Sequence, residues 1–451
     1  MRNCFVWTVV MLGSAFGVAA PLAGQVTPIT GWENQLFPSY LISTATLKVG
    51  EPPAEQHLLG EPFGVLGVEV EALAENTPVK VTITCDEYFE PSEFSGVLPT
   101  PGQKYTILPK VKFNFEKLSQ CRQATPTTVT FRVQLGSEPV TETSQTLTIR
   151  SINDCAFHIQ QGQQPVDMSL NFTAYVNEQH PFVDKLLREA LDLGVVDAFI
   201  GYQGKSPESV IRQVYALWDL MVARDLRYSS ITATAAASNS VASQHVRMLE
   251  ETINNTQANC VDGSVLFASL LRKIGIDSAL IMQPDHCYMG FWADEEHTIF
   301  LALETTLMGV TAETPDEVPE DLEASVDESL RRSKSWPSFV QAILDGTAKH
   351  LNDKEKFQTD PEYQVIDIAL ARQAGFLPIP YHNAEDFVAF DFTDYLEANG
   401  TDDSSDSDAS SDATVETEDE EDDDGGAESS EEQGEDTEDE PDDEEAEGND
   451  G

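Results

Sequence analysis

The sequence predicts an α+β protein in which an all-β segment precedes a helical segment and an antiparallel sheet. Between about residues 31 and 160, apolar and Thr-rich runs alternate with polar residues at the period of half-buried strands. From about 180 to 275 the apolar residues recur every three or four positions, which indicates amphipathic helices. Strand-like runs return from 277 to 305. The chain has 451 residues, and setting both ends aside leaves about 370 for two or three domains.

Residues 1–24 have the layout of a secretory signal peptide. Arg2 supplies a positive start, Phe5–Ala20 is an apolar run, and small residues around Ala23 suit a cleavage site. The apolar run is shorter than the ~20 residues of a membrane-spanning helix, and no other stretch approaches that length. We therefore expect a secreted, periplasmic or cell-envelope protein that has no integral membrane span after cleavage.

Residues 25–165 are predicted to form a β-sandwich-like domain. The strand pattern is carried by four runs: Val79–Cys85, Val111–Phe115, Val129–Leu135 and Gln145–Ser151. Turns that contain Pro and Gly separate these runs, as in layered antiparallel folds. A stretch rich in Gln and Pro, Gln160–Pro165, is expected to connect this domain to the next. Because it has no cluster of acidic and basic groups, we assign this domain a supporting or adhesive role.

Residues 166–398 are predicted to form an α+β domain. Helices are expected at 182–191, 210–221, 244–253, 260–274 and near 336–344, and strands at 277–283, 287–292, 298–305 and 363–368. The helix that begins at Cys260 is the best delimited of these elements. Arg272 and Lys273 lie in its last turn and Gly275 follows, in keeping with the usual signals that end a helix.

The charge of the chain is strongly negative and unevenly distributed. There are 79 Asp and Glu against 26 Lys and Arg, and residues 401–451 hold 27 of the acids and no base. This balance excludes a nucleic-acid-binding protein, because phosphate recognition depends on clustered cations. We expect residues 399–451 to be a disordered acidic tail, since such a composition cannot bury enough apolar surface to fold.

The cysteines are odd in number once the signal peptide is removed. The exported chain would keep Cys85, Cys121, Cys155, Cys260 and Cys287. In a compartment where disulfides form, at least one thiol must stay free or pair outside the chain. Two bridges among four cysteines would allow three connectivities, and the sequence leaves the pairing open.

Cys260, His286 and Glu304 are the candidate catalytic residues. A nucleophilic Cys needs a lowered pKa, a base that carries the proton and a group that orients the base. The positive end of a helix dipole stabilises a thiolate at Cys260. In a hairpin centred on Glu295, His286 and Glu304 lie directly opposite each other, which brings their Cβ atoms within ~5 Å. The three residues could therefore form a nucleophile, base and orienting acid.

These motifs resemble the transglutaminase-like domain of the papain-like cysteine enzymes. The resemblance covers about residues 175–310 and is carried by Asn259–Ile276 (NCVDGSVLFASLLRKIGI), by Asp285-His286 and by Leu303-Glu304-Thr305-Thr306. It implies a papain-like α+β core with Cys260 as nucleophile, His286 as base and Glu304 as orienting acid. The sequence departs from the family in having Glu where Asp is usual. It also has Cys-Tyr-Met after His286, where a small residue and Trp are common.

The function that follows is a secreted thiol enzyme acting on peptide or side-chain amide bonds through a thioester. Hydrolysis is favoured over cross-linking, and a protein or peptide is the expected substrate. The alternative is a catalytically inactive envelope protein that binds a polypeptide partner. The N–H of Cys260 is expected to be one oxyanion donor, with Gln244 and Gln257 as candidates for the second.

No cofactor or metal is expected at this site. Zinc would need a recognisable ligand spacing, and His286 and Cys287 are adjacent strand residues that point to opposite faces. Cys287 is therefore expected to be a buried thiol or a disulfide partner of the all-β domain. The acidic tail lacks the spacing of a calcium-binding loop.

Overall fold

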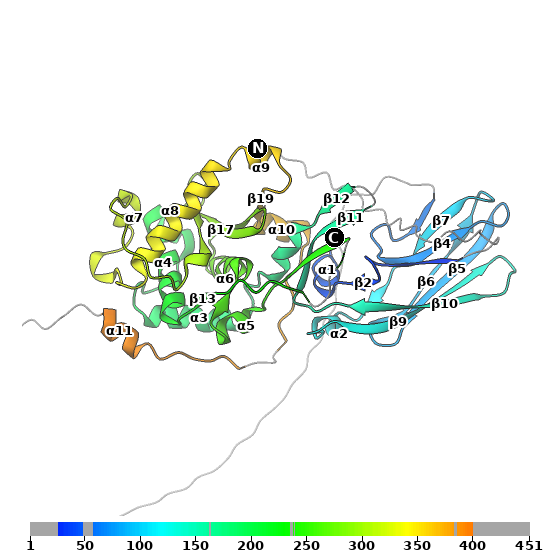
Figure 1. Ribbon diagram of the computed structural model, residues 1–451, viewed down its shortest axis with the longest axis horizontal. Helices are drawn as coiled ribbons and strands as arrows, with labels where there is room; N and C mark the ends of the chain where they lie inside the picture. The colour runs from blue at the N-terminus through cyan, green and yellow to red at the C-terminus, as the bar shows by residue number, and fades with distance from the viewer. Residues whose placement is uncertain are drawn as a thin grey trace, which may run out of the picture. The chain divides into compact units, whose positions relative to one another are not determined.

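The computed structural model describes residues 26–47, 57–161, 164–234, 238, 240–382 and 386–399. The predicted signal peptide lies outside these residues, as does all of the predicted acidic tail except Asn399. The described part is a mixture of helices and strands, which confirms the predicted α+β class (Figure 1). No helix within it is long and apolar enough to cross a membrane.

Two sheets make up most of the N-terminal part. A four-stranded sheet has the order β1-β4-β7-β3, and a six-stranded sheet has the order β2-β10-β9-β5-β6-β8. Their strands are β1 (Thr27–Thr30), β2 (Gln35–Leu36), β3 (Leu58–Gly60), β4 (Leu66–Glu71), β5 (Thr77–Cys85), β6 (Phe89–Leu98), β7 (Lys104–Leu108), β8 (Lys112–Phe113), β9 (Thr125–Leu135) and β10 (Thr141–Ile149). Two short helices accompany them, α1 (Pro38–Ser43) and α2 (Phe115–Ser119).

The alternation read from the sequence matches the burial of the central strands. In β5, Val79, Val81 and Ile83 are buried while the residues between them are more exposed. Val81 pairs with Val133 of β9, and residues of both sheets contribute to one apolar core. The strand expected at 111–115 is reduced to β8 because the Asn114 side chain accepts a hydrogen bond from the N–H of Lys117 and starts α2.

A third sheet joins the two predicted domains, with the order β12-β11-β14. It consists of β11 (Asp154–Gln161), β12 (Gln164–Asp167) and β14 (Val241–His245). Two predictions were wrong here. Within the expected connector, Gln160 and Gln161 belong to β11 and pair with Pro165 and Gln164 of β12. Gln244 belongs to a strand that pairs with Cys155 rather than to a helix. The domain boundary at 165/166 stays a prediction, although this sheet runs across it.

The helices of the C-terminal part follow the predicted periodicity. α3 (Pro181–Asp192), α4 (Pro207–Ala223) and α6 (Cys260–Lys273) contain the expected apolar stripes. The Ser206 side chain caps α4 by accepting from the N–H of Ser209, and Pro207 occupies the first turn. Gly275 has φ +80°, the left-handed conformation that ends α6 without a steric penalty.

A four-stranded sheet packs beside α6 and has the order β18-β17-β16-β19 (Figure 1). Its strands are β16 (Ser278–Gln283), β17 (His286–Trp292), β18 (Phe300–Leu303) and β19 (Gln364–Asp367). The long helix α8 (Trp336–Asn352) packs against β18. Gly346 of α8 permits a close approach, because a Cβ there would lie 2.6 Å from the carbonyl oxygen of Ala302.

Shorter elements complete the described chain. They are α5 (Leu249–Asn254), α7 (Glu320–Ala324), α9 (Lys356–Thr359), α10 (Ile368–Ala374), α11 (Thr393–Asn399), β13 (Arg227–Tyr228), β15 (Gln257–Ala258), and the 3₁₀ turns η1 (Ser169–Tyr175), η2 (Gly201–Gly204), η3 (Thr305–Leu307) and η4 (Glu328–Leu330). The last helix, α11, is anchored where the Tyr395 hydroxyl donates to the buried carboxylate of Asp219.

Candidate active site

Cys260 occupies the first turn of α6, and hydrogen bonds from the capping residues hold that turn in place. The Asn259 side chain accepts hydrogen bonds from the N–H groups of Val261 and Asp262, each 2.9 Å long. The Asp262 carboxylate accepts from the N–H of Asn259 and, at 2.6 Å, from the Arg247 guanidinium. The Cys260 N–H has no acceptor among the residues that the structure describes. This arrangement holds the thiol at the positive end of the helix with one amide donor left over.

His286 and Glu304 are hydrogen-bonded, with 2.8 Å between Nε2 and Oε2. The predicted hairpin register was wrong by two residues. Met289 pairs with Leu303, so the ladder is centred on Glu296, and the position opposite Glu304 is that of Tyr288. His286 and Glu304 are therefore diagonal neighbours on one face, a separation that long side chains still bridge.

The turn between β17 and β18 accounts for the difference in register. The Asp294 carboxylate accepts hydrogen bonds from the N–H groups of Thr298 and Ile299. His297 adopts a left-handed conformation with φ +57°. This side-chain capping sets the loop geometry, and the geometry sets which residues of the two strands face each other.

The Glu304 carboxylate is buried, and both of its oxygens accept hydrogen bonds. Oε1 accepts from the Thr306 hydroxyl at 2.7 Å, while Oε2 accepts from His286 and from the ammonium group of Lys349. Burial raises the pKa of Glu304, but the hydrogen bond and charge of His286 and the bond from Lys349 outweigh it, and the pKa falls to about 2. Glu304 is therefore an anion at any physiological pH.

The pKa of His286 is raised to about 9 by its neighbours. Burial lowers it, but hydrogen bonds to Cys260 and Glu304 and the Glu304 charge have the larger effect, while the Lys349 charge opposes them. Because Nε2 is directed at Glu304, Nδ1 is the nitrogen that remains for Cys260. The structure thus joins His286 directly to Glu304 and places Cys260 near enough to affect the pKa of the imidazole.

Lys349 was not predicted from the sequence. It lies on α8, and its Nζ is 3.2 Å from Nε2 of His286 and 5.2 Å from the centre of the Tyr288 ring. The Tyr288 ring in turn stacks on His286 with 5.7 Å between centroids. Lysines are common on the exposed faces of helices, so nothing in the local sequence distinguishes Lys349 from other surface lysines. Its position depends on how α8 crosses β18.

A small polar contact links the Cys helix to the Glu304 segment. The Ser264 hydroxyl donates to the Cys260 carbonyl at 2.7 Å and lies 3.3 Å from the hydroxyl of Thr305. Gly263 lies against Thr305, where a Cβ would come within 3.1 Å of it. Thr305, the residue after Glu304, is thereby held against the first turn of α6. These contacts keep the segment that carries Glu304 close to the start of the Cys helix.

Of the two candidates for a second oxyanion donor, Gln244 has the better environment. Its Nε2 is buried and has no hydrogen-bond partner in the part of the chain that the structure describes. Gln244 lies on β14, whose last residue, His245, accepts a 3.5 Å contact from the Asn259 side chain. Gln257 is exposed on β15.

The other four described cysteines are free and buried, as Cys260 is. Burial raises the pKa of Cys121, Cys155 and Cys287. Cys287 is completely shielded from solvent, which fits a buried thiol and not a disulfide partner. Burial therefore argues against nucleophilic reactivity at these three thiols.

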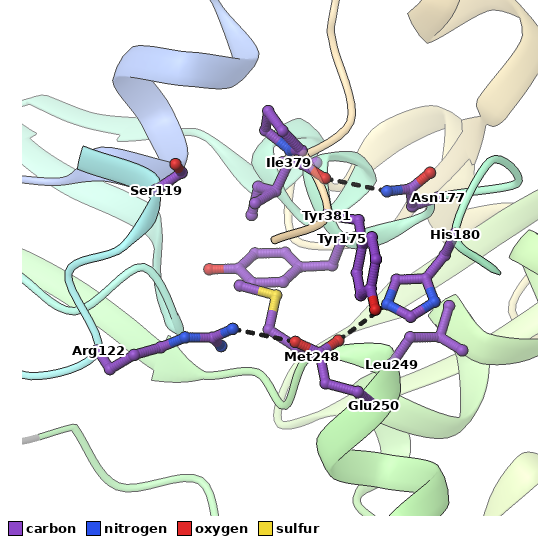
Figure 2. A pocket seen from close by; sticks show the side chains of 12 residues that line it. Ser119, Arg122, Tyr175, Asn177, His180, Met248, Leu249, Glu250, Ile379 and Tyr381 are labelled. Carbon is purple, nitrogen blue, oxygen red and sulfur yellow. Dashed lines mark hydrogen bonds and ion pairs between the residues drawn. The ribbon is translucent and has the colours of Figure 1, made fainter. Parts of the chain in front are cut away.

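A second cluster of charged side chains, which includes Arg122, His180 and Glu250, lines a small cavity (Figure 2). Glu250 accepts from Arg122 and pairs with His180, each at 3.0 Å, and the Tyr381 ring packs on the imidazole. The cavity among these residues measures about 20 Å³, which holds about one water molecule. The ion pair between Arg122 and Glu250 thus links the two parts of the chain.

Comparison of the chain with models of protein families, with curated proteins and with solved structures found no match. The assignment of a function therefore rests on the geometry of the site.

Proposed function

We propose that the protein is a transglutaminase-like thiol enzyme that acts on peptide or side-chain amide bonds through a thioester on Cys260. The observation that carries the proposal is the His286–Glu304 hydrogen bond beside the thiol at the start of α6. A nucleophile, a base and an orienting carboxylate in this order are what covalent acyl transfer requires. The order of helices, Cys helix and antiparallel strands supports a papain-like core, and the two N-terminal sheets support a β-sandwich-like domain.

The reaction begins with attack of the Cys260 thiolate on the amide carbonyl carbon. The S–C bond forms, negative charge develops on the oxygen, and the N–H of Cys260 donates to it. The C–N bond then breaks as His286 gives its Nδ1 proton to the departing amine. A water molecule attacks the thioester and gives its proton to His286, and sulfur leaves as the thiolate. Gln244 is the candidate for the second donor to the oxyanion.

Hydrolysis is the favoured outcome, with cross-linking as the variant in which a lysine amine replaces water. The substrate is proposed to be a protein or peptide, because its backbone and side-chain amides offer the carbonyl carbon that a thiol nucleophile attacks. The alternative function, an inactive envelope protein that binds a polypeptide, would leave the three side chains as a structural remnant. Thiol reactivity separates the two.

The experiment is alkylation of the folded protein with iodoacetamide at pH about 6, where an ordinary thiol with a pKa of about 8.5 is almost fully protonated. Peptide mapping then identifies the modified cysteine. We expect Cys260 to react at least about tenfold faster than any other described cysteine, because among them it alone contributes to the raised pKa of a histidine. His286→Ala should abolish this selectivity, whereas His297→Ala, which alters an exposed pair with Asp277, should retain it.

Slow and uniform labelling of all five cysteines in the wild-type protein would overturn the proposal and favour the inactive alternative. Unchanged selectivity in His286→Ala would also overturn it, since the base would then have no part in activating the thiol.

A further inference from the structure

Lys349 makes the site a group of four charged or ionisable side chains instead of three. Its ammonium group and Nε2 of His286 converge on the same oxygen, Oε2 of Glu304. The distance between Lys349 Nζ and His286 Nε2 is 3.2 Å, so two groups that can both be cationic lie in contact. Such an arrangement is electrostatically unfavourable unless the carboxylate between them is ionised and shared.

This contact differs from an ordinary surface ion pair. The side chain of Glu304 is only 5% exposed and that of Lys349 is 35% exposed. The stem of Lys349 is also held in place, because its ammonium group lies over the Tyr288 ring. The Tyr288 hydroxyl accepts from Gln283, which also donates to Asp353 just beyond the end of α8. Lys349 is therefore fixed by α8 and β17 together.

We infer that Lys349 is a positioning residue that keeps Glu304 paired with a cation when His286 gives up its proton. This inference rests on the proposed function, because it concerns the step in which the leaving amine is protonated. When His286 donates its Nδ1 proton, the imidazole becomes neutral and keeps the Nε2 hydrogen bond to Glu304. Without Lys349, the buried carboxylate would lose its only cationic partner in that step.

The consequence is that proton donation by His286 becomes easier. A carboxylate alone holds an imidazolium too firmly for a good general acid, whereas a neighbouring cation weakens that hold. The charged or titratable groups around the imidazole are Cys260 from α6, Glu304 before η3, Lys349 from α8 and Tyr288 from β17. Of these, only Lys349 opposes the protonated state by its charge.

The test is the titration of His286 by NMR in the full-length protein labelled with isotopic histidine, with the signal assigned from a His286→Asn variant. In Lys349→Met we expect the titration midpoint of His286 to rise by about one pH unit. Lys349→Arg should restore the wild-type midpoint. Lys354→Met is the matched control, an exposed lysine beyond the end of α8, and should leave the midpoint unchanged.

An unchanged or lowered midpoint in Lys349→Met, or failure of Lys349→Arg to restore it, would overturn the inference. If the Met variant does not fold, Lys349→Gln replaces it, because Gln keeps a hydrogen-bond donor without the charge. In that variant too, the titration midpoint of His286 should rise by about one pH unit. Alkylation of Cys260 in the same samples keeps the two proposals separate. A selective wild-type thiol with no Lys349 effect refutes this inference alone, and an unreactive wild-type thiol refutes the proposed function.

Discussion

Replacing Glu304 by Gln should remove a pH-dependent part of the stability of the protein. The pKa of His286 is about 9 in the folded state against an ordinary value of 6.5. At 1.36 kcal/mol for each unit, this shift corresponds to about 3 kcal/mol, and the 24% exposure of the imidazole reduces it to about 2 kcal/mol. Because the pKa is raised, this stabilisation is complete below pH 6.5 and is lost as the pH rises through about 9.

The assay is urea unfolding at pH about 6 and at pH about 9.5, on either side of this window. Between the two, the free energy of unfolding of the wild type should fall by about 1 kcal/mol more than that of Glu304→Gln, because the hydrogen bond to Cys260 also raises the pKa of His286 and remains in the variant. Asp277→Asn is the matched control, because it removes the carboxylate from the exposed His297 pair. It should change the stability by less than about 0.5 kcal/mol. If wild type and Glu304→Gln lose stability in parallel, the electrostatic account of the dyad is refuted.

Two further changes test the scaffold of the site. Asp262→Ala leaves Arg247, only 10% exposed, without its carboxylate, and urea unfolding should show a loss of about 3 kcal/mol together with slower alkylation of Cys260. Gly346→Ala places a Cβ 2.6 Å from the carbonyl oxygen of Ala302. It should lower the free energy of unfolding by about 1 to 3 kcal/mol and shift the NMR signals of His286, since α8 must move away from β18.

Each scaffold change has a control in an exposed position. Asp225→Asn alters the exposed pair with Arg227, and Asp345→Ala alters the residue before Gly346 on α8. Both should change the free energy of unfolding by less than about 0.5 kcal/mol. A loss in Asp262→Ala no larger than in Asp225→Asn would mean that the capping network does not hold the Cys helix. Wild-type stability in Gly346→Ala would mean that α8 does not pack as closely as described.

The Cys helix could be predicted from the sequence because its signals are local. Asn259 caps it, Asp262 completes the cap, and Gly275 ends it, all within a single stretch of chain. His286 and Glu304 could be paired by counting along a hairpin, since an error of two residues keeps both side chains on the same face. The exact register depended on how Asp294 caps the turn, which residue counting does not reveal.

The features that the sequence missed depend on contacts between distant segments. Gln244 was expected in a helix but forms a strand, because the edge of β11 offers hydrogen-bonding partners that outweigh local propensity. Lys349 became part of the site only through the close approach of α8 to β18 at Gly346. Gln244 was named from the sequence as a candidate oxyanion donor, and only its placement in a helix was wrong. Lys349 carries no local mark of its role, so only the assembled structure identifies it.

The pairing of β14 with β11 also bears on how the protein can be divided. β14 (Val241–His245) precedes the Cys helix in the chain. Its hydrogen-bonding partner, β11, belongs to the segment predicted as a separate domain. The hydrogen bonds from Asn153 to Val246 and Glu251 tie the same two segments together. A fragment that starts at residue 166 would therefore expose the edge of β14, which would have lost β11 as its partner, upstream of the Cys helix. We therefore expect the two segments to fold together, and heating should melt both parts in one cooperative transition.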